Sequence, residues 1–341
     1  MNSVEDFLEK GKLLSPEVYS RLKDMEEEEI DRLMDSDSLV LRDEDIRRAS
    51  IPAPEVEKRT GMNRDGHLFI SDFTDFYLQR FEFLKQEIEE KMDGTTTTIN
   101  KADGSSSVVG MIRRNGEDET VLEDKTGKLT VRTDEKFLAD EVVGIKGRVI
   151  TNDEKVMDPE TFFFPDIPLN KDINQTEQDL KALFVSDLSE VDRERVEGLD
   201  VDYVFVAGNV GKNDLGTTVI SLSDTYEQRT DTLKGKDPLR VSVGSIDVMV
   251  HSGEAIEEAK QTLELDERRA AIELLKKRHL YPTKSPGLED VYLLEEVPDI
   301  VHMDGEGSMV NYKGTTFVST SDDTGYVIDL SSREVEEVEL S

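Results

Sequence analysis

The amino-acid sequence predicts a multidomain α+β protein that contains an N-terminal helical module, a small β-barrel and a layered α/β domain. Three observations predict this organisation. Apolar residues recur at helical spacing before residue 45, about five short strands with internal glycines follow between residues 107 and 164, and short, largely apolar strands begin at Lys181. The length of 341 residues suits two or three domains of ordinary size.

The helical module is expected over residues 1–45. Ser15, Pro16 and Glu17 mark the start of a helix in it. The serine hydroxyl can cap the helix, proline is tolerated at the first helical position, and an acid interacts favourably with the positive end of the helix dipole. Residues 46–70 are charged, contain two prolines and lack a long apolar stripe, so we expect a linker there.

A strongly amphipathic helix is expected over residues 71–95, leading into the barrel. Its apolar residues step by three or four positions and are mostly aromatic: Phe73, Tyr77, Phe81, Leu84 and Ile88. This stripe can either contact a partner or pack against its own domain, and we favour packing within the domain.

The barrel is expected over residues 96–168 and to be of the OB type, because about five short strands occupy roughly 60 residues. Glycines inside the strands permit the sharp coiling that such a barrel requires. OB barrels bind single strands through basic and aromatic residues. Aromatic residues are sparse here, so base stacking is poorly supported. The candidate nucleic-acid contacts are the cations Arg113, Arg114, Lys128 and Arg132.

The net charge of −35 comes from 77 acidic and 42 basic residues that are spread over the whole length. One interpretation is an acidic binder of basic partners. The other, which we favour, is a protein from an extreme halophile, in which an acidic surface maintains solubility in molar salt. At about 1 M salt the Debye length falls to about 3 Å, so the charge does not exclude work on nucleic acid.

Several classes of protein are disfavoured by composition. The chain has no cysteine, which excludes disulfides, iron–sulfur clusters and thiolate zinc sites. No run approaches 18 apolar residues, so neither a membrane span nor a membrane partner is expected. The first residues lack the basic and apolar regions of a secretory signal. We therefore expect a cytoplasmic protein.

The third domain, expected over residues 176–341, places polar residues after its apolar strands. Asp187 follows the strand at 181–186, and Asn209 follows the strand at 203–207. His251 follows a third strand at 246–250. Apolar strands of this kind are usually buried on both faces of a sheet in a layered α/β fold.

The residues of four stretches resemble one known family. They are the barrel blocks VVGMIRR, VLEDKTGKLTVR, DEVVGIKGRV and FFFPDIP (108–168), then IDVMVHSGEAIEE (246–258), LKKRHLYP (275–282) and EEVPDIVHMDGEG (295–307). In order and spacing the chain resembles the small subunit of the archaeal family D DNA polymerase over nearly its whole length. The resemblance implies an OB barrel followed by a calcineurin-like phosphoesterase domain, which in the family carries a metal-dependent 3′–5′ exonuclease.

The family's metal ligands match this chain poorly. A binuclear centre needs several Asp, Asn and His ligands around two cations. By the resemblance, Asp187 matches the first aspartate, Asn209 replaces the bridging aspartate, and His251 matches a lone histidine. Ser189 stands where a histidine is expected, and a Gly-His-x-His motif falls on residues 304–307, which contain no histidine. We therefore expect a degenerate site with no confident catalytic or metal-binding residue.

The sequence thus predicts a non-catalytic accessory subunit of a family D replicative polymerase, with the large catalytic subunit as its partner and DNA as a further candidate partner. No cofactor is expected. One alternative is a 3′–5′ proofreading exonuclease with a rebuilt site, which would need Mn²⁺ or another divalent metal and would use residual ligands such as Asp187 and His251. A second alternative is a single-stranded DNA-binding OB module.

A dense basic cluster stands at residues 276–279, with the sequence Lys-Lys-Arg-His. It can contact nucleic-acid phosphate or an acidic partner. Equally, its cations can complement the dipole at the end of a helix. The sequence leaves these two interpretations open.

Overall fold

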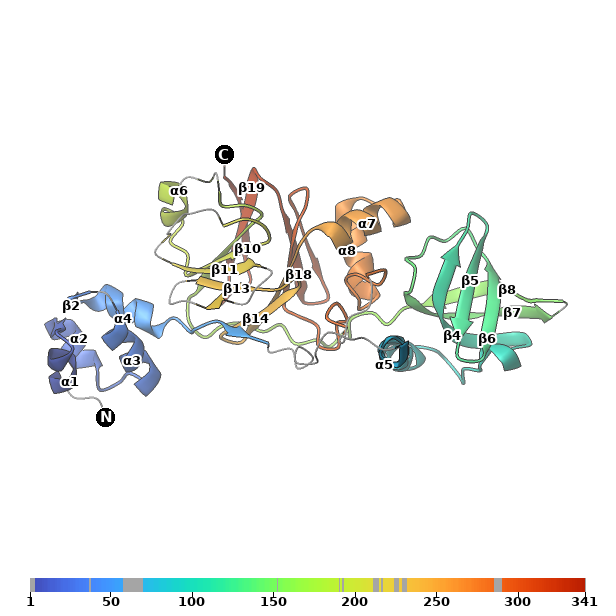
Figure 1. Ribbon diagram of the computed structural model, residues 1–341, viewed down its shortest axis with the longest axis horizontal. Helices are drawn as coiled ribbons and strands as arrows, with labels where there is room; N and C mark the ends of the chain where they lie inside the picture. Colours follow the sequence, from blue (N-terminus) through green and yellow to red (C-terminus); the bar gives the residue numbers. More distant parts are fainter. Residues whose placement is uncertain are drawn as a thin grey trace. The chain divides into compact units, whose positions relative to one another are not determined.

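The computed structural model describes residues 4–36, 38–57, 70–151, 153–189, 191, 193–210, 215, 217–223, 227–228, 232–284 and 290–340. The chain divides into two compact units, Met1–Glu55 and Val56–Ser341, which are described separately (Figure 1). None of the described helices is long and apolar enough to cross a membrane.

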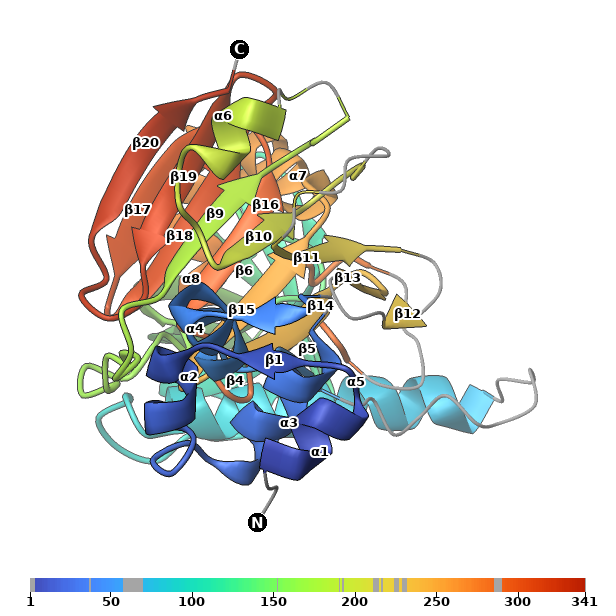
Figure 2. The same cartoon turned by 90° about the vertical axis from the view of Figure 1, so that its left-hand side faces the viewer.

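The first unit is a helical module (Figure 2). Its elements are α1 (Val4–Glu9), β1 (Leu13–Leu14), α2 (Pro16–Arg21), α3 (Glu27–Asp35), β2 (Val40–Leu41) and α4 (Asp43–Ser50). Ser15 caps α2 as predicted, since its hydroxyl accepts the Val18 N–H at 3.4 Å. The module extends beyond residue 45, because α4 continues to Ser50 and buries Ile46 and Ala49 in the module's core.

Helix α5 (Ile70–Glu89) packs against the outside of the barrel. Phe81, Leu84 and Ile88 are buried there against apolar residues of the barrel strands. Gly144 permits this close approach, since a Cβ at that position would lie 2.5 Å from a methyl carbon of Ile88. These residues therefore pack within their own unit; the side chain of Phe73 lies outside the described set.

The barrel is closed and five-stranded. Its strands are β4 (Gly104–Asn115), β5 (Glu119–Asp124), β6 (Gly127–Arg132), β7 (Val142–Thr151) and β8 (Lys155–Phe163). They follow the order β4-β5-β6-β8-β7, and β6 and β8 are parallel, which is the Greek-key arrangement of an OB barrel. Gly147 allows β7 to approach β8, because a Cβ there would lie 2.3 Å from the Asp158 carbonyl oxygen.

The remaining domain contains two sheets. The seven-stranded sheet has the order β12-β13-β11-β10-β9-β19-β20. Its strands are β9 (Lys181–Val185), β10 (Tyr203–Val206), β11 (Thr218–Leu222), β12 (Glu227–Gln228), β13 (Thr232–Gly235), β19 (Thr324–Asp329) and β20 (Val335–Glu339). The six-stranded sheet has the order β17-β18-β16-β15-β14-β3. Its strands are β3 (Glu55–Val56), β14 (Leu239–Val243), β15 (Ile246–His251), β16 (Ile300–Asp304), β17 (Ser308–Tyr312) and β18 (Thr315–Thr320).

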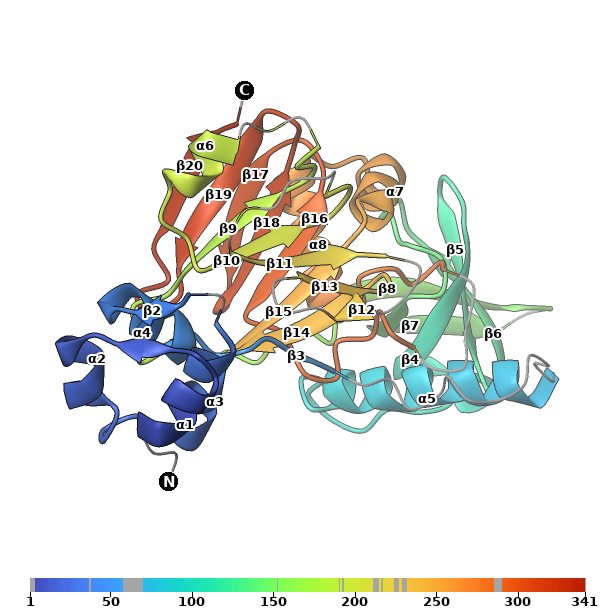
Figure 3. The same ribbon diagram turned by 60° about the vertical axis from the view of Figure 1, so that its left-hand side comes forward.

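The two sheets are stacked, and helices cover their outer faces (Figure 3). The rings of Phe184 and Phe205 stack at 4.9 Å, and the Phe184 ring meets His302 of the other sheet edge-on at 5.3 Å. Helices α7 (Glu254–Leu263) and α8 (Glu267–Lys276) pack on the six-stranded sheet, whereas α6 (Arg193–Glu197) packs on the seven-stranded one. The predicted multidomain α+β fold with a layered α/β domain is confirmed.

Candidate functional site

Asp187 and Asn209 lie at one edge of the seven-stranded sheet. Strands β9 and β10 are parallel and in register, with Val185 opposite Val206, so both strands end at this edge. The Asp187 carboxylate accepts the Ser189 N–H at 2.6 Å, and the Asn209 carbonyl accepts the Leu188 N–H at 2.8 Å. The structure therefore brings these two predicted residues to neighbouring strand ends, where Asp187 stabilises its own turn.

His251 ends β15 in the other sheet and is completely buried. Its Nδ1 lies 2.5 Å from the Ser252 carbonyl, so Nδ1 carries the proton and donates it to that oxygen. The rings of Tyr281 and Tyr292 lie 6.0 and 5.2 Å away. Burial lowers the pKa of His251 despite the Asp237 carboxylate 3.8 Å from Nδ1. The imidazole is thus neutral, and its Nε2 has no hydrogen-bond partner among the described residues.

The loop at residues 304–307, where the resemblance expects two histidines, is tied to α8 instead. The buried Glu267 carboxylate accepts the Glu306 N–H at 2.8 Å and the Ser308 hydroxyl at 2.6 Å. The Glu306 carboxylate pairs with Lys260 of α7. A Cβ at Gly305 would lie 2.6 Å from Glu267 Oε2. The carboxylates of Glu267 and Glu306 therefore join the loop to α8 and α7.

A metal centre does not fit the residues that the structure describes. Within the described ranges, no group of three or more His, Asp or Glu side chains could hold a metal ion. A neutral imidazole such as His251 is chemically able to bind a metal, but two cations require more ligands than the two residual candidates, Asp187 and His251, supply.

The buried polar groups near this edge connect the two sheets. The Ser186 and Thr320 hydroxyls lie 2.9 Å apart, and His302 Nε2 lies 2.9 Å from the Thr320 hydroxyl. All three side chains are buried. Burial lowers the pKa of His302 to about 3, so this histidine is neutral and stabilises the interface between the sheets.

His302 should make the stability depend on pH. In the unfolded chain a histidine binds its proton near pH 6.5, whereas His302 in the folded protein resists protonation down to about pH 3. The wild type should therefore lose stability as pH falls from 6.5 towards 3, by about 1.4 kcal/mol per pH unit from this group. His302→Gln keeps an amide to bond Thr320 and should lose less. Urea unfolding at pH 7, 5.5 and 4 in constant salt measures this, and parallel losses in both proteins would contradict it.

The predicted nucleic-acid contacts of the barrel are all engaged with acids. Each of the four cations has a carboxylate oxygen within 4 Å: Arg113 with Glu123 and Asp140, Arg114 with Glu119, Lys128 with Glu123, and Arg132 with Asp158. A paired cation must give up its carboxylate before it can bind a phosphate, and these acids would repel that phosphate.

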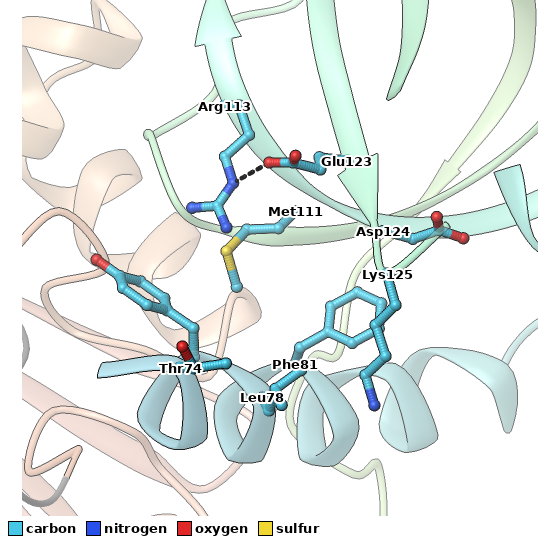
Figure 4. A pocket seen from close by; sticks show the side chains of 9 residues that line it. Thr74, Leu78, Phe81, Met111, Arg113, Glu123, Asp124 and Lys125 are labelled. Carbon is cyan, nitrogen blue, oxygen red and sulfur yellow. Dashed lines mark hydrogen bonds and ion pairs between the residues drawn. The ribbon is translucent and has the colours of Figure 1, made fainter. Parts of the chain in front are cut away.

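A cavity of about 340 Å³ lies between α5 and strands β4 and β5 (Figure 4). Phe81, Leu78 and Met111 form part of its apolar lining. Two cations also line it. Lys125 pairs with Glu82 at 2.6 Å, and the Arg113 guanidinium pairs with Glu123 and lies 5.4 Å from the centre of the Tyr77 ring. The lining carries both signs of charge, so it has no cationic surplus that would select a phosphate.

The basic cluster at 276–279 is largely an internal feature. Lys277 pairs with Glu141, in the loop before β7, at 3.0 Å, and both side chains are at most 2% exposed. Glu141 also accepts the Leu138 N–H at 3.0 Å. Burial raises the pKa of Glu141, and Lys277 opposes that rise. The nearby Lys277 ammonium lies 4.8 Å from the centre of the Phe164 ring.

The next two residues of the cluster are linked to α5, Arg278 directly and His279 through Asp290. Arg278 pairs with Glu87 and donates to two backbone carbonyls. His279 Nδ1 accepts the Tyr281 N–H at 3.1 Å, so the ring is neutral and donates its Nε2–H to Asp290 at 2.9 Å. Buried Arg80 of α5 also pairs with Asp290. We call Arg80, Glu87, Glu141, Lys277, Arg278, His279 and Asp290 the ionic staple.

The ionic staple argues against contact with nucleic acid, which is one of the two interpretations that the sequence left open for this cluster. Lys277, Arg278 and His279 are at most 4% exposed, so they cannot reach a phosphate on the surface. Only Lys276 of the four is half-buried, where it pairs with Glu273 at 2.7 Å. Sequence reasoning missed the staple because its acids lie up to about 210 positions away from its cations.

The fold and this site define a class of protein in which an OB barrel is joined by buried ion pairs to an α/β domain of two sheets. Polar residues stand at the strand ends of that domain, but the described residues include no metal-binding cluster. No family model matches the chain. Curated relatives nevertheless confirm the resemblance that the sequence motifs predict.

The chain is similar to DNA polymerase II small subunits of archaea. It is 22% identical to that of Archaeoglobus fulgidus, over 76% of this chain and 71% of the relative. It is 22% identical to that of Pyrococcus abyssi and 21% identical to that of Pyrococcus furiosus, in each case over 76% of this chain and 58% of the relative. The chain thus spans under two thirds of the Pyrococcus proteins.

Among solved structures, a novel archaeal phosphodiesterase aligns with 47% of this chain and 100% of its own, at 13% identity and a TM-score of 0.30. A predicted phosphoesterase from Streptococcus pneumoniae aligns with 48% of this chain and 99% of its own, at 15% identity and a TM-score of 0.27.

Proposed function

We propose that this protein is a non-catalytic accessory subunit of a family D replicative DNA polymerase and scaffolds the large catalytic subunit. The similarity to DNA polymerase II small subunits supports the role in replication. The observation that carries the non-catalytic assignment is the strand-end edge, where Asp187 supports its own turn and the described residues include no metal-binding cluster.

The ionic staple suits a scaffold. Charged groups buried from water must stay paired, because an unpaired buried charge is strongly unfavourable. The staple therefore holds α5, the barrel and the two-sheet domain in one arrangement, which presents a preformed surface to a partner. A preformed surface loses little conformational freedom on binding, and an interface of this kind does not depend on metals.

The partner is tested by co-purification. The tagged chain and the large catalytic subunit of a family D polymerase are expressed together and purified in molar KCl, the condition that the acidic composition favours. We expect a stable complex that survives gel filtration. A large subunit that elutes alone, while the tagged chain remains folded, would refute the scaffold role.

The absence of nuclease activity is tested separately. A labelled primer is incubated in high salt with Mn²⁺ and either the chain or its complex with the large subunit. We expect no more degradation of the primer than an Asp187→Ala variant produces. Digestion that needs Mn²⁺ and disappears in Asp187→Ala would instead establish the proofreading exonuclease. Because the assay of the chain alone does not depend on co-purification, the two parts of the proposal can fail independently.

A further inference from the structure

Exposed apolar side chains concentrate in the N-terminal helical module. Among the described residues, eight large apolar side chains are more than about a third exposed, and five of them belong to this module: Leu8, Leu13, Tyr19, Leu39 and Val40. Single exposed apolar residues are normal on protein surfaces, whereas contiguous ones mark binding sites. The question is therefore whether these residues adjoin one another.

Three of them do. Leu13 of β1 and Val40 of β2 are directly paired in a parallel ladder, and the Leu13 N–H donates to the Leu39 carbonyl at 2.8 Å. Successive side chains of a strand point to opposite faces. Leu14 and Leu41, the next pair, face the module's core, so Leu13 and Val40 share the outer face. Leu39 precedes Val40 in the chain and is 72% exposed. We call Leu13, Leu39 and Val40 the apolar strand patch.

The module that carries the patch has a negative net charge. Residues 1–55 contain 16 acidic and 8 basic residues, a net charge of −8. That is about one net negative charge per 7 residues, against about one per 10 for the whole chain. The two lysines beside the patch are engaged internally: Lys10 pairs with Asp35 at 2.9 Å, and Lys12 donates to the carbonyls of Ser36 and Ser38.

We propose that the apolar strand patch is a docking site for a protein segment whose apolar face is flanked by lysines or arginines. Apolar contact with Leu13, Leu39 and Val40 would supply most of the affinity, and the surplus acids would select a basic partner. A second copy of the chain is disfavoured because two acidic modules repel each other. The proposal is independent of the function proposed above.

Two synthetic peptides serve as probes. One is a 14-residue amphipathic helix with leucines on one face and lysines on the other, and its twin carries glutamates in place of the lysines. Binding to the full chain is measured by fluorescence anisotropy at moderate salt. We expect the lysine peptide to bind at least about tenfold more tightly than its twin, and Leu13→Ser/Val40→Ser to weaken its binding at least about tenfold.

Controls separate this site from general attraction to an acidic protein. Leu169→Ser removes an apolar side chain that is 88% exposed outside the module, and it should bind the lysine peptide like the wild type. Leu39→Ser offers a second patch variant if the double variant misfolds. Equal binding by the patch variants and the wild type, or by the two peptides, would overturn the proposal. So would a wild-type dimer in sedimentation that Leu13→Ser/Val40→Ser abolishes, because a second copy would then cover the patch.

Discussion

Lys277→Met is expected to destabilise the protein by about 3–5 kcal/mol, because it leaves the Glu141 carboxylate buried without its cation. Both side chains are at most 2% exposed, so water cannot replace the lost ammonium. The Glu141 carboxylate would still accept the Leu138 N–H, but it would lose the ammonium that balances its charge. The free energy of unfolding, measured by urea titration at constant molar salt, gives this cost directly.

Two variants show whether the uncompensated charge causes the loss. Glu141→Leu/Lys277→Met removes both charges and should recover much of the stability, since apolar replacements of a buried ion pair are often neutral or better. Lys284→Met breaks an exposed pair with Glu254 and should cost at most about 1 kcal/mol. If Lys277→Met costs no more than Lys284→Met, the buried pair is not what holds this part of the staple together.

Arg80→Met is expected to cost a similar amount, about 3–5 kcal/mol, because the buried Arg80 pairs with the Asp290 carboxylate, which is only 10% exposed. Arg80 also donates to the Pro282 carbonyl at 2.8 Å. Removing it breaks one of the links between α5 and the segment that follows α8. It also leaves the Pro282 carbonyl without this donor and the Asp290 carboxylate with His279 as its remaining named donor. Lys85→Met, on the same helix, breaks a partly exposed pair with Glu89 and should cost at most about 1 kcal/mol.

Arg80→Met should also alter the sensitivity of the fold to acid. Burial raises the pKa of Asp290, but His279 and Arg80 outweigh burial and lower this pKa to about 2. An unfolded aspartate titrates near 3.9, so the pair's stabilisation is complete above about pH 4 and is lost as pH falls towards 2. Wild type should lose about 2 kcal/mol from this group in that window. Arg80→Met should lose less, and an equal loss would show that Arg80 does not set the Asp290 pKa.

The sequence predicted most of the elements because their causes are local. Glycines between short apolar runs indicated a coiled barrel, and Gly147 lies where β7 needs a close approach to β8. Ser15 before Pro16 predicted the start of α2, which the structure has. The sequence placed the end of the module at residue 45, whereas α4 continues to Ser50. Ile46 and Ala49 are too few apolar residues to indicate a buried helical face within a charged segment.

The candidate site was predictable in part. A shortage of histidines is a property of composition, and strand-end positions such as Asp187 and Asn209 follow from short apolar strands. The present role of these positions was not predictable. Contacts between the elements depend on which strands and helices lie together. Two examples are the bond between Glu267 and the 304–307 loop and the bond between His302 and Thr320 of neighbouring strands.

By itself, the sequence determined the kinds of secondary structure, the acidic composition and the shortage of histidines, since each depends on residues that are near in the chain or simply counted. The tertiary structure alone decided which charges are buried. Arg80 meets Asp290, and Lys277 meets Glu141, across separations of more than 130 residues. A cation at the end of a helix has the same local sequence pattern whether it is solvated by water or paired with a carboxylate that is distant in the chain. Only the folded chain brings that carboxylate within 3.0 Å of the cation.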